Sequence, residues 1–225
     1  MSHVTGVIGI SSSELSRFAV FYHSLANVQK PPHTALAHST GASIATNRNE
    51  VTEKALQSGA EWIWYVDDDQ MFAPDALTRL LSRRLDIVSG IYLQRSAPFY
   101  PHMYHRGDKQ GVYPRMLESG DSGLVELEAV GAGCLLVKTK VLRALDRPFW
   151  RLGQIRSDVW GDDLDFCNRV RAAGFKVWCD LDVRVGHIFS GIVTPTLNQD
   201  QTWSTTLSQL DNTPFVSWPA ATEMQ

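Results

Sequence analysis

Short apolar runs alternate along this chain with segments whose apolar residues recur at helical spacing. Runs typical of buried strands occupy residues 6–10, 36–37, 61–66, 86–93, 130–137 and 175–179. Helical spacing marks residues 15–25, 42–56, 74–84, 138–145 and 160–174. Strands that alternate with helices predict an α/β fold with a mostly parallel central sheet flanked by helices.

The remaining segments have weaker patterns. Residues 124–129 alternate loosely and predict an edge strand, whereas residues 99–105, 106–122 and 147–159 are expected to be loops, with a short strand at 112–116. From Ile188 to Gln225 the chain is rich in Thr, Ser, Gln and Asn and has few charges. We therefore expect one domain over residues 1–187 and a flexible, partly irregular tail or flap over 188–225.

Three consecutive carboxylates, Asp67, Asp68 and Asp69, follow the most aromatic of the apolar runs. Ligands of open α/β sheets bind outside the carboxyl ends of strands, and three like charges at such a point require a cation or a protonated partner. A divalent cation bound by one or two carboxylates and by substrate phosphates fits this requirement. The alternative is an acidic turn that caps the helix beginning near Pro74.

A second acidic cluster begins the helix that follows Trp160. Asp162 and Asp163 lie at its N-terminus, where the helix dipole favours ionised carboxylates. A carboxylate that stays deprotonated near a negatively charged substrate can act as a general base. Helix capping is the alternative, although one carboxylate would suffice for it.

Other segments suggest ligand contacts, each with a structural alternative. Ile10 and Ser11 end the first run beside a seryl loop that fits either a nucleotide or a helix cap. Asn47 and Arg48 could reach a diphosphate or a base, or could lie on a solvated helix face. Arg95 begins a polar and aromatic loop suited to sugar or acceptor contacts, or to a surface cover.

Two further features occur late in the chain. Gly131 and Gly133 frame Ala132 before a buried strand, where they would let the backbone approach a ligand closely or form a β-bulge. His187 follows a glycine and is either a hydrogen-bonded loop residue or a metal ligand, if the fold returns it to Asp69.

Composition narrows the classes of function. A net charge of -3 argues against a general polyanion binder. The N-terminus lacks a signal-peptide layout and no apolar run approaches the roughly 20 residues that span a bilayer, so we expect a cytoplasmic protein without a membrane span. The three cysteines lack metal or disulfide spacing and are expected to be buried. A local basic cluster fits either a nucleic-acid acceptor or a solvated loop: Arg95, His102, His105, Arg106, Lys109 and Arg115.

Taken in order, these motifs resemble those of the GT-A fold glycosyltransferases, in particular the inverting family 2-like enzymes of the bacterial and phage branch, whose family includes cellulose and hyaluronan synthases. Asp67-Asp68-Asp69 is similar to the Asp-x-Asp motif and Gly131-Ala132-Gly133 to the glycine loop. Gly161-Asp162-Asp163 is similar to the x-Glu-Asp motif, with Asp162 where the family usually has Glu. His187 is similar to the C-terminal metal histidine. The resemblance covers residues 4–187.

The resemblance implies a GT-A catalytic domain that binds Mn²⁺ or Mg²⁺ through Asp69 and His187, with Asp67 on the ribose or the water shell of the metal. Asp163 would be the base and Asp162 would orient the acceptor. Donor contacts are expected from Asp67, Asp68, Arg48, Asn47, Ile10, Ser11, Gly131, Ala132, Gly133, Arg95 and Trp160.

The expected activity is transfer of a sugar from a nucleotide-sugar donor, a UDP-sugar first of all, to a hydroxyl acceptor with inversion. The acceptor could be a glycan, a protein, a small molecule or modified DNA, and an oligomer is compatible with the polar tail. Two alternatives remain: a nucleotide-sugar binding protein without catalysis, and a sugar-phosphate nucleotidyltransferase.

Overall fold

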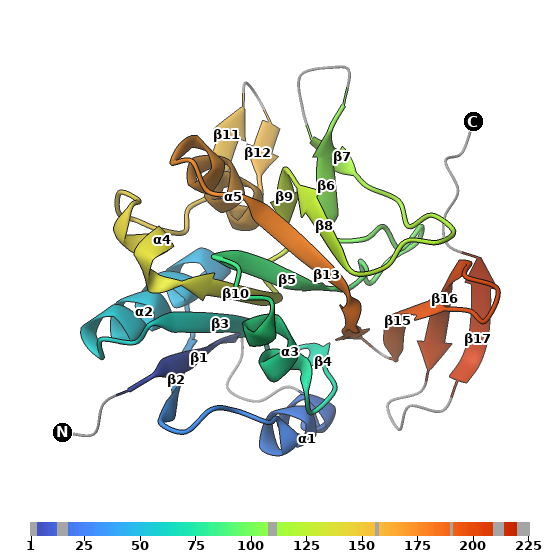
Figure 1. The fold of residues 1–225 in the computed structure, drawn as a ribbon, viewed down its shortest axis with the longest axis horizontal. Coiled ribbons are helices and arrows are strands. Elements are labelled where there is room, and N and C mark those ends of the chain that lie inside the picture. The colour runs from blue at the N-terminus through green and yellow to red at the C-terminus, as the bar shows by residue number, and fades with distance from the viewer. Residues whose placement is uncertain are drawn as a thin grey trace.

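A seven-stranded mixed sheet forms the centre of the molecule. The structure, a computed structural model, describes residues 4–12, 18–107, 112–155, 158–189, 191–208 and 214–219. In spatial order the sheet contains β2 (Thr34–Thr40), β1 (Gly6–Ser12), β3 (Trp62–Asp67), β10 (Cys134–Lys138), β5 (Ile87–Ile91), β13 (Val177–Arg184) and β8 (Leu124–Leu127). All of them run in one direction except β10 and β8. The predicted mostly parallel sheet is therefore confirmed, and residues 124–127 form its edge as expected (Figure 1).

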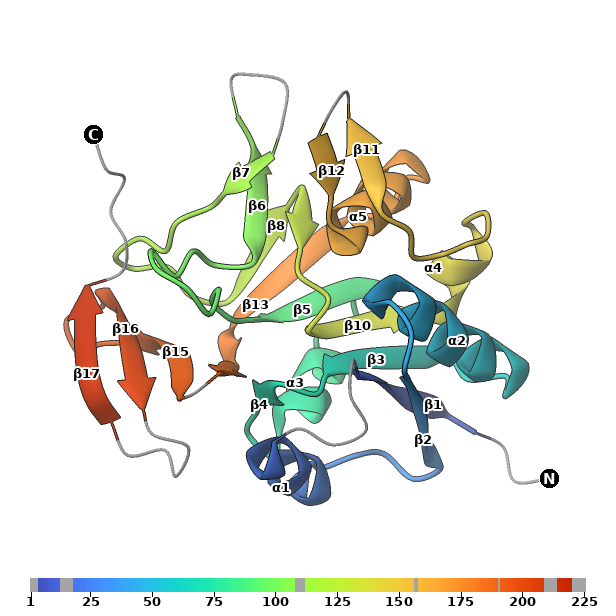
Figure 2. The same ribbon diagram turned by 180° about the vertical axis from the view of Figure 1, so that it is seen from behind.

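Alternate residues of the central strands face two separate cores. On β3, Ile63 and Tyr65 join one apolar cluster, while Trp62, Trp64 and Val66 join the other. The first cluster packs against α2 (Ile44–Gln57), α4 (Thr139–Arg143) and α5 (Asp162–Ala172). The second packs against α1 (Ala19–Asn27) and α3 (Ala76–Ser82). Helices thus cover both faces of the sheet, with α3 and α2 on opposite sides (Figure 2). This is why the strands read as continuous apolar runs.

The C-terminal region forms a second sheet in the described residues. Its order is β17 (Pro214–Pro219), β16 (Trp203–Ser208), β15 (Ile192–Leu197), β14 (Gly186–Ile188) and β4 (Gln70–Met71). These antiparallel strands lie beside the ends of β3 and β13 (Figure 1). The sequence predicts a tail or flap here, because polar Thr and Ser strands lack a strong apolar pattern. The expected boundary after His187 falls inside β14.

Other predicted loops also contain strands. The short strand predicted at residues 112–116 is confirmed as β7 (Val112–Pro114). It pairs with β6 (Met103–Arg106), which lies where loops were expected, and β6 also pairs with β9 (Ala129–Val130). The predicted loop 147–159 contains β11 (Gly153–Ile155), which pairs with β12 (Asp158–Trp160). These strands are two to four residues long. Such lengths are too short to show a period in the sequence.

The expectation for the cysteines is met in the structure. Cys134, Cys167 and Cys179 are free thiols and all are buried. Burial raises the pKa of each thiol, to about 11 for Cys134 and about 12 for the other two. These residues therefore act as small apolar side chains. Among the described residues, no helix combines the length and apolar character needed to cross a bilayer.

The packing of α3 predicts the effect of truncating a leucine. Leu77 is fully buried against the sheet, whereas Leu152 is 65% exposed. Leu77→Ala should lower the free energy of unfolding by about 3 kcal/mol, because it leaves a cavity in the core. Leu152→Ala should change it by less than about 0.5 kcal/mol. Urea unfolding of both variants checks this, and equal effects would contradict the assigned packing of α3.

Candidate active site

The acidic segment forms a strand end and a tight turn. Asp67 is the last residue of β3, and Asp68 and Asp69 make the turn into β4. Asp68 and Asp69 are buried. The alternative that these residues cap a helix is wrong, because α3 begins with Asp75 at its N-cap position. The acidic turn is thus held between two sheets, at the carboxyl end of β3.

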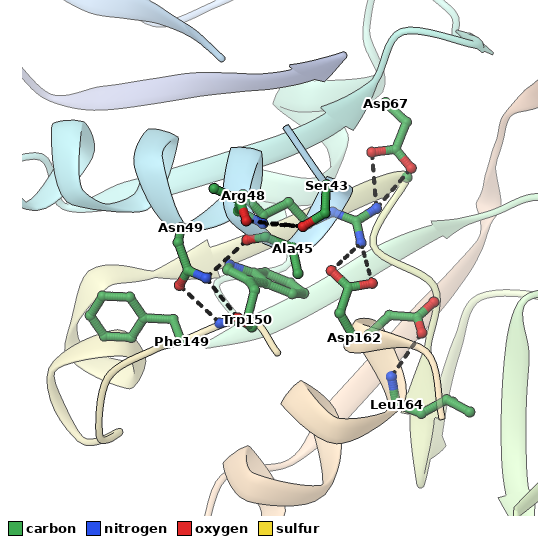
Figure 3. A network of polar contacts seen from close by, with 12 residues as sticks. Ser43, Ala45, Arg48, Asn49, Asp67, Phe149, Trp150, Asp162 and Leu164 are labelled. Carbon is green, nitrogen blue, oxygen red and sulfur yellow. Dashed lines mark hydrogen bonds and ion pairs between the residues drawn. The ribbon is translucent and has the colours of Figure 1, made fainter. Parts of the chain in front are cut away.

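Arg48 connects this strand end to the second acidic cluster. Its Nη2 lies 2.9 and 2.8 Å from the two carboxylate oxygens of Asp67, and its Nη1 lies 2.9 and 2.8 Å from those of Asp162. Figure 3 shows the guanidinium between the two carboxylates. Arg48 is only 4% exposed, so the solvated helix face considered for it is wrong. Instead, this side chain joins β3, α2 and α5.

Aromatic packing holds Arg48 in this position. The guanidinium carbon lies 5.3 Å from the ring centre of Trp150, which stacks on Phe166 at 4.1 Å. The Trp150 backbone N–H donates to the Asn49 side chain, which donates in turn to the Trp150 carbonyl (Figure 3). The indole N–H donates to Thr52, one turn after Arg48 on α2. The loop before β11 is therefore fixed against the helix that carries Arg48.

The charges at this junction act on one another strongly. Burial alone would lower the pKa of Arg48, but the nearby carboxylates Asp67, Asp162 and Asp163 outweigh it and raise that pKa. Arg48 therefore remains protonated. Burial is the largest effect on Asp67 and raises its pKa, while Arg48 opposes this effect and Asp69 adds to it. The guanidinium is thus what permits two carboxylates to lie at one buried point.

Asp163 differs from its neighbour Asp162. Its Oδ1 accepts a hydrogen bond of 2.8 Å from the backbone N–H of Leu164, and its carboxylate is not a hydrogen-bond partner of Arg48. Burial raises the pKa of Asp163 to about 6, with Arg48 opposing the shift and Asp162 adding to it. A carboxylate with this proton affinity can accept a proton near neutral pH. Asp162 instead is committed to Arg48, which leaves Asp163 as the more available base.

His187 returns to Asp69 through the second sheet. In β14 it pairs with Gln70 of β4, which places its Nε2 3.5 Å from Asp69 Oδ2. Its Nδ1 lies 2.7 Å from the carbonyl oxygen of Leu93. A carbonyl only accepts, so Nδ1 is the donor, and Nε2 is the ring nitrogen that faces Asp69. Arg95 Nη1 contacts the same Asp69 oxygen at 3.0 Å.

Asp69 and His187 fit a divalent cation that takes only some of its ligands from the protein. Asp69 Oδ2 and His187 Nε2 are an oxygen and a nitrogen donor turned toward each other, and both side chains are largely buried. In the described part of the chain, no group of three or more His, Cys, Asp or Glu could hold a metal. If a cation binds between these two donors, phosphate oxygens and water would complete its coordination.

The glycines of the loop before β10 serve close packing. A Cβ at Gly131 would lie 2.0 Å from the hydroxyl oxygen of Tyr92, and one at Gly133 would lie 2.9 Å from Gln70 Nε2. The Gly133 N–H donates to the Tyr92 hydroxyl at 3.0 Å, and its carbonyl accepts from the Asp67 N–H at 3.2 Å. Ala132 is fully buried. The predicted close approach exists, but the approaching group is a tyrosine of the protein.

The residues near β1 that were predicted to contact the donor differ in their surroundings. Asn47 is fully buried and its amide binds the carbonyls of Ser12 and Ala42, so it ties α2 to the sheet. Ile10 is buried. Ser11 pairs in register with Asp67, and its buried hydroxyl has no hydrogen-bond partner among the described residues. The seryl residues Ser11 and Ser12 belong to β1, so they do not cap α1, which follows Phe18.

Two arginines of the basic cluster have acidic partners of their own. Arg106 pairs with Glu128 and Arg115 pairs with Asp121, so both are neutralised locally. Lys109 and the side chain of Trp160 lie outside the part of the chain that the structure describes. Arg95 contacts Asp69, and the ring of His102 lies 6.0 Å from the ring of His187, centre to centre.

The sequence did not identify Tyr92 as a site residue, and it placed His102 in a basic loop cluster, whereas the structure packs His102 against Tyr92. Their rings stack at 4.6 Å, and each lies within 6.0 Å of the His187 ring, centre to centre. Burial lowers the pKa of His102 to about 3, and the neighbouring His187 contributes to this shift. His102 is therefore neutral at physiological pH. Tyr92 directly follows β5, so its place at a strand end was the available signal.

Loss of the Arg48 bridge should be costly. Arg48→Met leaves Asp67 and Asp162 without their shared cation and should lower the free energy of unfolding by about 3 kcal/mol. Adding Asp162→Asn should restore part of this loss. The matched control is Arg79→Met, because Arg79 forms an exposed pair with Asp75 and such pairs contribute less than about 1 kcal/mol. Urea unfolding measures all three, and an Arg48→Met effect no larger than the control would contradict the bridge.

No family model and no curated protein matches this chain. Among solved structures, A197 from STIV superposes with a TM-score of 0.59 at 12% identity, over 92% of this chain and 94% of that one. S. aureus TarS 1–349 gives 0.47 at 10% identity, over 79% and 58%, and the T. maritima inositol-1-phosphate CTP transferase gives 0.44 at 9%, over 80% and 90%. The chain therefore shares the fold of A197, and the predicted GT-A-like α/β fold is confirmed.

Proposed function

We propose that this chain is a metal-dependent glycosyltransferase that moves a sugar from a nucleotide-diphosphate sugar, a UDP-sugar first of all, to a hydroxyl acceptor with inversion. The observation that supports this most is the meeting of the two acidic segments on Arg48, where Asp67 and Asp162 bind one guanidinium. Inverting transfer needs a site for a charged diphosphate and a carboxylate base beside it. The candidates for these two roles are Asp69 with His187 and, beside Arg48, Asp163.

Asp69 and His187 are the residues that would hold the cation. When bound, Mn²⁺ or Mg²⁺ would act as a Lewis acid that neutralises charge on the departing diphosphate. Asp67 and Asp68 would face the nucleoside side of the donor, next to the buried hydroxyl of Ser11. Arg48 keeps Asp67 in place and limits the repulsion among these carboxylates.

Asp163 is the proposed general base. The acceptor hydroxyl oxygen attacks the anomeric carbon from the face opposite the diphosphate, and the bond from that carbon to the phosphate oxygen breaks. The acceptor proton passes to the carboxylate of Asp163, and the nucleoside diphosphate leaves. Because Asp162 is bound to Arg48, its part in this step is to position the start of α5, which carries Asp163.

Removal of the base tests the activity directly. Asp163→Asn should reduce transfer, or donor hydrolysis with Mn²⁺, by about 10²- to 10⁴-fold while UDP binding stays within a factor of two to three. Asp146→Asn, an exposed carboxylate outside the site, is the matched control and should retain full activity. A panel of nucleotide sugars with calorimetry of UDP binding provides the measurements. Full turnover in Asp163→Asn would remove this residue from the role.

The rate should depend on pH through the same carboxylate. Since the pKa of Asp163 is raised to about 6, the base is ionised above that pH and protonated below it. We expect kcat/KM to fall about tenfold per pH unit below pH 6 and to level off above it. A flat profile from pH 5 to 8 would contradict this assignment.

Two outcomes would favour other functions. Donor binding without hydrolysis or transfer, for every nucleotide sugar tested with Mn²⁺, would indicate a binding protein without catalysis. Release of pyrophosphate from a nucleoside triphosphate and a sugar phosphate would indicate a nucleotidyltransferase.

A further inference from the structure

Arg95 contacts the carboxylate oxygen of Asp69 that also faces His187. Its Nη1 lies 3.0 Å from Asp69 Oδ2, and the same oxygen lies 3.5 Å from His187 Nε2. The Arg95 side chain is 43% exposed, whereas the side chain of Asp69 is 9% exposed. The guanidinium therefore neutralises a mostly buried carboxylate from the solvent side.

Asp69 and His187 are held by hydrogen bonds, whereas Arg95 lies in an exposed segment. The carbonyl of Asp69 accepts from the Ile188 N–H at 2.7 Å, and the His187 ring is fixed by the Leu93 carbonyl at 2.7 Å. Arg95 instead begins an exposed loop, in which residues 95–98 are all exposed. Asp69 and His187 are held by the second sheet, whereas Arg95 is not. Of the two contacts to Asp69 Oδ2, the one with Arg95 is therefore the easier to break.

A guanidinium and a divalent cation cannot share one carboxylate oxygen without strong repulsion. A cation that binds Asp69 Oδ2 and His187 therefore competes with Arg95 for this oxygen. Once released, the guanidinium remains tethered beside the site, where the next anion to arrive is the diphosphate of the donor. Arg is well suited to this partner because its fork of N–H groups binds two phosphate oxygens together.

We propose that Arg95 is an exchangeable counter-ion of Asp69, which gives this oxygen up to a divalent cation and then binds the donor diphosphate. This inference rests on the proposed function. It differs from a simple donor contact, because it makes Arg95 unfavourable for cation binding and favourable for diphosphate binding.

Calorimetry with Mn²⁺ alone and then with UDP at saturating Mn²⁺ separates these two effects. Arg95→Met should bind Mn²⁺ roughly three- to tenfold more tightly than the unmodified protein, because a partly exposed competing ion pair is lost. The same variant should bind UDP about tenfold more weakly. Arg95→Lys keeps the positive charge and should retain the original Mn²⁺ affinity, but it should not restore UDP affinity, since lysine lacks the planar fork.

Arg79→Met is the matched control, since it also removes an arginine from an aspartate pair, Arg79 with Asp75 at the surface of α3. It should leave both affinities unchanged. Unchanged or weaker Mn²⁺ binding in Arg95→Met, or unchanged UDP binding, would overturn the exchange. Asp69→Asn serves a separate purpose, because undiminished Mn²⁺ binding in that variant would refute the cation site of the proposed function itself.

Discussion

The bidentate pairing of Arg48 with two carboxylates is the interaction on which the site depends. Asp67 ends β3 and Asp162 begins α5, and both would repel each other if buried without a cation. The guanidinium is supported by Trp150, and its helix is bound to the same loop through Asn49. One buried arginine thus sets the distance between the acidic strand end and the helix that carries Asp163.

The second sheet completes the site from the other side. Because β14 pairs with β4, a histidine late in the chain lies against the acidic turn. The same region contains Tyr92, which fills the space left by Gly131 and Gly133 and stacks on a neutral His102. One wall of the site is therefore tightly packed. Arg95, on an exposed loop, contacts Asp69 from the solvent side, with 43% of its side chain exposed.

Much of the layout could be predicted because it depends on local patterns. The order of strands and helices follows from apolar periodicity. Asp67 to Asp69 were found because they directly follow a buried run, and Asp162 and Asp163 because they begin a helix. The errors have physical causes. The strands of residues 192–208 are short on apolar residues, so their pairing is decided by partners distant in sequence. Asn47 was predicted to contact a ligand because the sequence does not show whether an asparagine amide is buried or exposed. Only the hydrogen bonds of its amide to the carbonyls of Ser12 and Ala42 show that it is a structural residue.

The sequence by itself determined the α/β fold class, the buried character of β3 and the presence of two acidic segments, because each depends on residues that are neighbours along the chain. Only the tertiary structure decided which charges meet. In the folded protein, Arg48 pairs with Asp67 and Asp162. The pKa of Asp163 is raised, and His187 and Arg95 approach the same oxygen of Asp69. The reason is that electrostatic partnership depends on distance and burial in space, which no local pattern encodes.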